Sequence, residues 1–134
     1  MHIPLRSLIV LLPALFLAGA PSGAAEPPKV ASLLKKSLAD LGDKEAVMLT
    51  VEYAPGQSSA PHRHNAHTFV YVLQGAVLMG VQGKEPVRVE AGETFYEAPT
   101  DVHTISRNAS ASEPARFLVF FIKDSGAPTS VPVQ

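Results

Sequence analysis

The chain has 134 residues, and its 11 basic and 12 acidic side chains give a formal net charge of −1 at pH 7. Because there is no basic excess and no basic stripe, nucleic acid is not an expected partner. The sequence contains no cysteine, which excludes disulfides, thiol catalysis and thiolate-bound metal.

Residues 1–25 have the composition of a secretory signal peptide. Arg6 precedes an apolar run at residues 8–18, and small residues follow this run. The run is too short to cross a bilayer, although the pattern leaves an uncleaved membrane anchor open as an alternative. We therefore predict a periplasmic or secreted protein that has no membrane contact after cleavage. About 109 residues then remain, enough for one domain.

Residues 26–45 are predicted to form a linker and one short N-terminal helix. The linker contains Pro27 and Pro28, and apolar residues then recur at helical spacing up to Gly42, which is a typical helix stop. The residues that set this spacing are Val30, Leu33, Leu34, Leu38 and Leu41.

Residues 46–123 have the pattern of an all-β domain. Apolar and polar residues alternate from Ala46 to Tyr53, and Pro55-Gly56 ends the run. Further strands are predicted at residues 68–73, 76–82, 86–90, 94–97, 102–107 and 115–123, separated by turn residues. Short strands at this spacing predict a sandwich or a small barrel. The tail, residues 124–134, has no clear element.

Two of these strands, residues 69–73 and 117–122, are apolar on both faces. A strand of this kind is normally covered on both sides. The second cover could be the N-terminal helix or another subunit. We predict a homodimer.

The histidines are concentrated in two short segments. His62, His64 and His67 lie close together, and His103 follows a turn that begins at Pro99. On a strand, residues two apart share a face and their Cα atoms lie about 6–7 Å apart, so His62 and His64 can converge on one ion. An isolated His-x-His pair is often only a pair of surface residues. Here the pair follows a Pro-Gly loop and precedes an apolar strand, which favours a metal site.

Two segments resemble the two sequence motifs of the cupin superfamily. The first is Gly56-x5-His62-x-His64-x10-Gly75, and the second runs from Gly92 to His103 with Asn108 beyond it. The resemblance spans about residues 48–122. It implies a double-stranded β-helix, or jelly-roll barrel, with one divalent metal ion in its lumen, held by His62, His64 and His103.

The chain departs from this family pattern at two places. Thr68 stands where the first motif usually has a glutamate ligand, and Asp101 replaces the glycine of the turn before His103. Strand alternation places Thr68 inward, which predicts a site of three histidines. A bend at Asn65-Ala66 would instead bring His67 inward as a fourth ligand, and both models stay open. Glu97 and Asp101 are carboxylates near the mouth of the site. Of the two interpretations, metal ligand and solvated turn residue, the second is favoured for both because acids are common in loops.

The resemblance leaves two functions open. The first is a metal-dependent enzyme that acts on a small molecule, such as a dioxygenase similar to quercetinases. The alternative is a non-catalytic module of the cell envelope that binds a metal or a small ligand. The metal could be Fe, Mn, Zn, Ni or Cu, because imidazole suits several of these ions. Neutral imidazole ligands would leave the ion its full charge of +2, which would attract anionic or enolate-like substrates.

Overall fold

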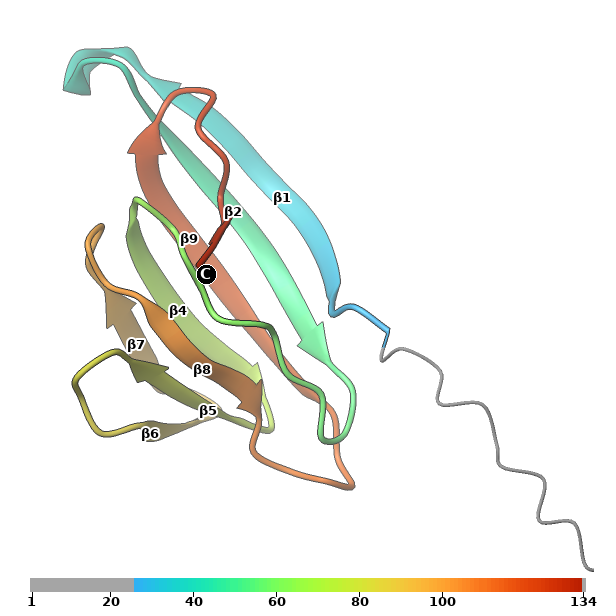
Figure 1. Cartoon of the computed structure of the whole chain (residues 1–134). Helices are drawn as coiled ribbons and strands as arrows, with labels where there is room; N and C mark the ends of the chain where they lie inside the picture. The colour runs from blue at the N-terminus through green and yellow to red at the C-terminus, as the bar shows by residue number, and fades with distance from the viewer. Residues whose placement is uncertain (1–25, 134) are drawn as a thin grey trace, which may run out of the picture.

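A computed structural model describes residues 26–133, which fold into two antiparallel sheets of five strands each (Figure 1). The strand order is β1-β2-β9-β4-β7 in one sheet, sheet A, and β10-β3-β8-β5-β6 in the other, sheet B. The elements are β1 (Lys29–Leu38), a 3-10 turn (Ala39–Leu41), β2 (Lys44–Tyr53), β3 (His62–Arg63), β4 (His67–Gln74), β5 (Ala76–Val81), β6 (Val87–Glu90), β7 (Thr94–Glu97), β8 (His103–Asn108), β9 (Ala115–Asp124) and β10 (Val131–Pro132).

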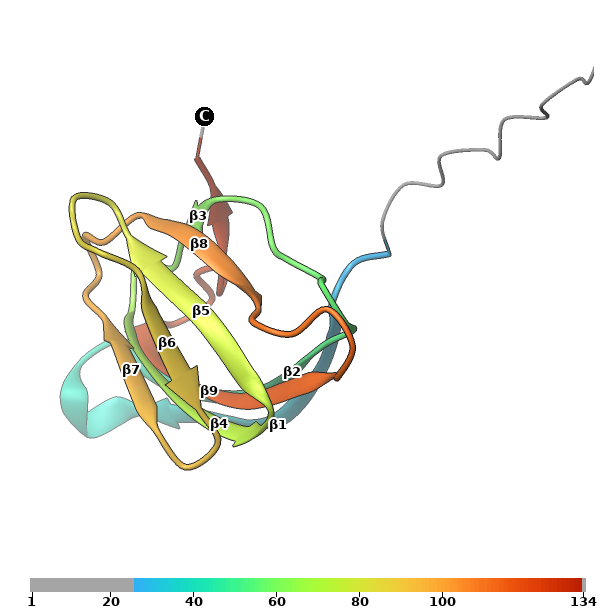
Figure 2. The ribbon, with the colours of Figure 1, turned by 90° about the horizontal axis from the view of Figure 1, so that it is seen from below.

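The two sheets face each other (Figure 2), and the side chains between them form one apolar core. Inward residues from sheet A, such as Val72, Phe117 and Phe121, pack against Val77 and Met79 from sheet B. Each of these side chains is at most 3% exposed. The predicted all-β jelly-roll architecture is therefore confirmed, and the seven strands predicted between residues 46 and 123 all form.

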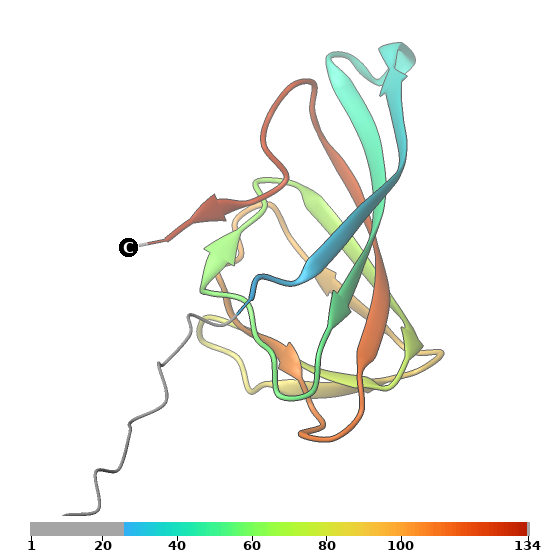
Figure 3. The ribbon, with the colours of Figure 1, turned by 90° about the vertical axis from the view of Figure 1, so that its right-hand side faces the viewer.

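The predicted N-terminal helix is wrong, because residues 29–38 form strand β1. This strand pairs along its length with β2 and extends the edge of sheet A, and the tip of the β1–β2 hairpin projects beyond the barrel (Figure 3). Nearly all residues of β1 are exposed, so the helical spacing of its apolar residues does not correspond to a buried face. Backbone pairing with β2 determines the extended conformation instead.

The C-terminal tail also has more structure than expected. Lys123 contacts the carboxylate of Glu45 and the carbonyl oxygen of Ala127, which holds the tail where it leaves β9. The tail then returns to the barrel, where β10 pairs with β3. The expected signal peptide lies outside the described residues. Within residues 26–133, no helix has the length and apolarity needed to cross a membrane.

The outer face of sheet A carries a patch of aromatic and aliphatic side chains. Phe69, Tyr71, Leu73 and Tyr96 are between 40% and 48% exposed there, and Phe120 is half-buried beside Phe69. No strand or helix of the described residues covers this patch, since β1 lies at the sheet edge. An uncharged patch of this kind can meet a copy of itself without like-charge repulsion. We propose that a second copy of the chain covers it.

Gly75 makes the turn between β4 and β5 in a left-handed backbone conformation that favours glycine. Its φ angle is +70°, and a Cβ atom at this position would lie 2.6 Å from the carbonyl oxygen of Pro114. Gly83 has a similar φ angle of +80° but has open space where its Cβ would be. A comparison of substitutions at Gly75 and Gly83 therefore distinguishes the cost of backbone strain, which both share, from the cost of a steric clash, which only Gly75 has.

Replacing Gly75 by alanine is expected to destabilise the fold more than replacing Gly83. Both variants place alanine at positive φ, which costs about 1–2 kcal/mol. Gly75→Ala additionally forces Pro114 to move, at a cost of about 1–3 kcal/mol. Free energies of unfolding from urea titrations measure the difference. Equal losses in the two variants would contradict the predicted contact with Pro114.

The proposed homodimer is tested by light scattering at tens of micromolar protein, where even a weak interface with a micromolar Kd is populated. We expect twice the mass of one chain, and Phe69→Glu should convert the dimer to monomer by burying a charge in the interface. Val87→Glu is the matched control, because Val87 is 46% exposed on sheet B. A monomeric native protein would refute the proposal.

Candidate metal centre

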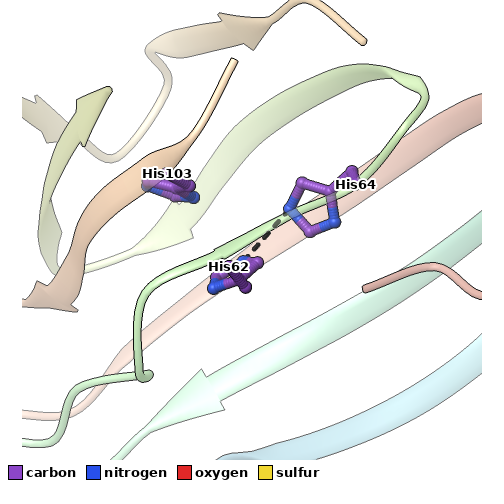
Figure 4. A group of neighbouring side chains, drawn as sticks. All are labelled: His62, His64 and His103. Atoms are coloured by element: carbon purple, nitrogen blue, oxygen red, sulfur yellow. Dashed lines mark hydrogen bonds between the residues drawn. The ribbon is translucent and has the colours of Figure 1, made fainter. Parts of the chain in front are cut away.

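Three histidines converge between the two sheets because of strand pairing. His62 on β3 lies directly opposite His103 on β8 in the antiparallel register, and His64 follows two residues after His62. One nitrogen from each ring lies within 4.8 Å of the other two. Figure 4 shows the three rings turned toward a common space, with His103 reaching it from the neighbouring strand.

Backbone carbonyls fix the orientation of two of these rings. The Nδ1 atom of His62 lies 2.7 Å from the carbonyl oxygen of Ala60, and Nδ1 of His64 contacts the carbonyl oxygen of Thr129. A carbonyl oxygen only accepts hydrogen bonds, so both Nδ1 atoms carry the proton. In neutral rings both Nε2 atoms then have lone pairs, and these atoms are 3.2 Å apart. Two ring nitrogens at this distance either share a proton in a hydrogen bond or bind one metal ion together, and metal-binding histidines commonly donate their other N–H to a carbonyl in this way.

Burial favours the neutral form of the rings. Burial lowers the pKa of His64 to about 4, partly opposed by the contact with the Thr129 carbonyl and assisted by the nearby His62 ring. Burial also lowers the pKa of His103 to about 4, with the neighbouring His62 and His64 rings acting in the same direction. At neutral pH these two rings are therefore uncharged and present lone pairs, the form in which imidazole binds metals.

Glu97 is buried beside the histidines, so the prediction that it is a solvated turn residue is wrong. Its side chain is 2% exposed, and Oε2 lies 3.1 Å from Nδ1 of His103 and 3.9 Å from Nε2 of His64. Burial raises the pKa of Glu97 to about 7, and the negative charge of Asp101 adds to this effect. Asp101 is a turn residue as expected, because its side chain accepts a hydrogen bond from the backbone of Ala98.

Four buried atoms of Glu97 and His103 have no hydrogen-bond partner within the described residues. They are both carboxylate oxygens and both ring nitrogens. Buried polar atoms without a partner are costly and uncommon, so a cluster of them indicates a place for a bound ion or water. The residues present therefore fit a metal ion chemically.

The alternation along β4 shows which of Thr68 and His67 points into the barrel. Thr68 is fully buried, whereas His67 is exposed on the opposite face and its Nδ1 lies 2.7 Å from the hydroxyl of Tyr96. The bend at Asn65, whose φ angle is +49°, does not change this alternation. The structure thus does not bring His67 to the other histidines. Thr68 points inward, and its hydroxyl donates a hydrogen bond to the carbonyl of Ala66.

A cavity of about 160 Å³ lies next to the histidines. Most of its wall is apolar, and its polar members are the histidines, Glu97, Tyr53 and residues of the C-terminal tail. The Tyr53 hydroxyl is already paired with Ser59 and Ser106, at 2.6 and 2.7 Å. The polar side chains without partners are therefore those grouped around the histidines.

Sequence reasoning missed two contributors to this site, Glu97 and Thr129. Glu97 shares the inner face of β7 with the half-buried Phe95, so the alternation in Thr94-Phe95-Tyr96-Glu97 was a usable signal. Thr129 contributes only a backbone carbonyl, which any residue could supply. No signal in the sequence identifies it.

Several solved structures have a fold similar to that of this chain. An uncharacterised double-stranded β-helix protein from Klebsiella pneumoniae is 20% identical with a TM-score of 0.64, covering 83% of this chain and 88% of that one. A predicted oxalate decarboxylase from Thermotoga maritima is 23% identical with a TM-score of 0.59, covering 72% and 80%. A recombinant oxalate oxidase in complex with glycolate is 27% identical with a TM-score of 0.59. There the match covers 80% of this chain but only 56% of the oxidase.

No sequence among the curated proteins matches this chain. The family model described as the cupin domain matches residues 49–121, which is more than half of the sequence and runs from within β2 to within β9. The resemblance seen in the two histidine motifs is thereby confirmed. The chain belongs to the cupin family.

Proposed function

We propose that the protein binds one divalent transition-metal ion through His62, His64 and His103 and that it acts as a metal-dependent enzyme on a small molecule. The observation that carries this proposal is the pair of Nε2 lone pairs 3.2 Å apart, held in place by carbonyl contacts on the other side of each ring. His103 faces the same space from the adjacent strand.

An ion held by His62, His64 and His103 would have room for a further ligand, and it would supply Lewis-acid chemistry to a substrate oxygen. The mostly apolar cavity wall lowers the local dielectric constant, which strengthens electrostatic interactions beside it. The cavity volume of about 160 Å³ is close to that of an engineered cavity that holds benzene, so the substrate is expected to be small.

Within this class we propose a dioxygenase-type reaction on a small anionic or enol-containing substrate. The likeness to an oxalate oxidase crystallised with glycolate supports a small carboxylic acid as the ligand. The size of the cavity argues against a complete flavonol, so quercetinase-like activity would require the mouth of the site to widen. The alternative function, a non-catalytic metal- or ligand-binding module of the cell envelope, uses the same residues.

The first prediction concerns metal binding. We expect one divalent ion per chain, and His62→Ala and His103→Ala should each weaken binding by more than the 10–100-fold seen when a residue that only orients a ligand is lost. Both variants should also lose the metal-dependent rise in melting temperature. Equilibrium dialysis with elemental analysis gives the stoichiometry and the affinity.

His67→Ala is the matched control for these variants. It removes an imidazole from the same segment but from the outer face of β4. Its metal affinity should stay close to that of the native protein. If His62→Ala and His103→Ala also keep native affinity, the assignment of the site is wrong.

The second prediction separates the enzyme from the binder. Protein loaded with Fe²⁺, Mn²⁺, Ni²⁺, Cu²⁺ or Zn²⁺ is mixed with oxalate, glycolate, small enols or a flavonol, and oxygen uptake and product formation are followed. We expect turnover with a small substrate that is lost in His103→Ala. Tight metal binding without turnover of any of these compounds would favour the non-catalytic module.

A further inference from the structure

We propose that Glu97 is the fourth protein ligand of the metal ion, supplied by β7 from the sheet that faces His62 and His103. This inference rests on the proposed metal site. It assigns a role to a buried carboxylate that the three-histidine site leaves without a partner.

The distances around Glu97 are those between neighbouring ligands of one ion. With metal–nitrogen bonds of about 2.0–2.1 Å, adjacent ligand atoms lie about 2.8–3.4 Å apart in octahedral or tetrahedral geometry. The Oε2 atom of Glu97 is 3.1 Å from Nδ1 of His103, and the Nε2 atoms of His62 and His64 are 3.2 Å apart. Glu97 Oε2 is 3.9 Å from Nε2 of His64, longer than for adjacent ligands but within reach of one ion that contacts both atoms.

The approach of Glu97 to His103 is not explained by a hydrogen bond. Although the two atoms are close, neither has a hydrogen-bond partner of acceptable geometry, and both are shielded from solvent. A carboxylate oxygen and a ring nitrogen that face the same space in this way are arranged as two electron-pair donors. A cation in that space would satisfy both of them.

Strand register explains how the carboxylate comes from β7. Thr68 on β4 and Glu97 on β7 are directly opposite each other in the antiparallel pair, and both are buried. Side chains in such a pair share one face of the sheet, with Cβ atoms about 4.5–5.5 Å apart. A glutamate at either position therefore enters the same region of the barrel. Thr68 occupies the first-motif position where a glutamate is usual. In this chain the glutamate is Glu97, opposite Thr68 on the adjacent strand.

A carboxylate ligand changes the properties of the site. It lowers the net charge of the ion and its ligands from +2 to +1, which weakens the attraction for anions compared with a site of histidines alone. Four protein ligands fill a tetrahedral site, whereas a six-coordinate ion keeps two positions for small molecules. The proposal therefore favours ions that accept octahedral geometry and oxygen ligands, such as Mn²⁺ or Fe²⁺, over tetrahedral Zn²⁺ for a reaction at the ion.

The test compares Glu97→Gln with the native protein by Mn²⁺ affinity and by the visible spectrum of bound Co²⁺, which reports the ligand set. The substitution keeps the side-chain shape and removes the charge. We expect Mn²⁺ affinity to fall by more than about 100-fold, beyond the range for a residue that only orients a ligand, and the Co²⁺ spectrum to change. Glu85→Gln is the control, because it removes one negative charge from an exposed turn.

The exchange variant Thr68→Glu/Glu97→Thr tests the register directly. It returns a carboxylate to the same face from β4, so Mn²⁺ affinity should recover by at least about tenfold over Glu97→Gln, as expected for a regained ligand. If Glu97→Gln keeps Mn²⁺ affinity within about 100-fold and leaves the Co²⁺ spectrum unchanged, Glu97 is not a ligand. If the native protein binds no ion at all, the proposed function fails first. The two failures are therefore distinguishable.

Discussion

The Nδ1 atoms of His62 and His64 each face a backbone carbonyl oxygen, and this pairing determines which ring nitrogen is free to bind an ion. One carbonyl belongs to Ala60, in the segment just before β3, and the other belongs to Thr129 in the C-terminal tail. The tail is held by Lys123, whose ammonium group contacts Glu45 and Ala127, and by the pairing of β10 with β3. The chemistry of the site thus depends on contacts made far from it in the sequence.

The barrel adds a second constraint, because it places donors from both sheets around one small space. His62 and His103 are cross-strand partners in sheet B, and Glu97 comes from sheet A. The surrounding wall is mostly apolar, which keeps the His64 and His103 imidazoles neutral and leaves the polar atoms of Glu97 and His103 without other partners. In such a wall a cation is the simplest group that satisfies all four side chains at once.

Much of this arrangement could be predicted from the sequence because the signals were local. Alternation along residues 68–73 placed Thr68 inward and Phe69 outward, and the structure agrees. The spacing of His62 and His64 and the turn before His103 indicated a shared site, and the three rings do converge. The same alternation applied to residues 94–97 would have placed Glu97 inward beside Phe95, but the general preference of acids for loops was given more weight.

The features that were missed depend on contacts distant in sequence. Residues 30–41 have a helical spacing of leucines, yet pairing with β2 makes residues 29–38 an edge strand whose side chains are mostly exposed. The two-residue strands β3 and β10 have too few residues to show a period. Strand β10 exists only because the tail returns to the barrel and pairs with β3, which also pairs with β8. The carbonyl of Thr129 carries no side-chain signature, so only the folded chain reveals its contact with His64.

The central claim is that one ion occupies the space between His62, His64 and His103, and anomalous diffraction tests it most directly. Crystals grown with Mn²⁺ or Co²⁺ would be measured on both sides of the absorption edge of the metal. We predict a single strong anomalous peak per chain, about 2.0–2.3 Å from the Nε2 atoms of His62 and His64 and from a ring nitrogen of His103. An anomalous map without a peak among these rings, at a metal concentration that saturates binding in solution, would contradict the account.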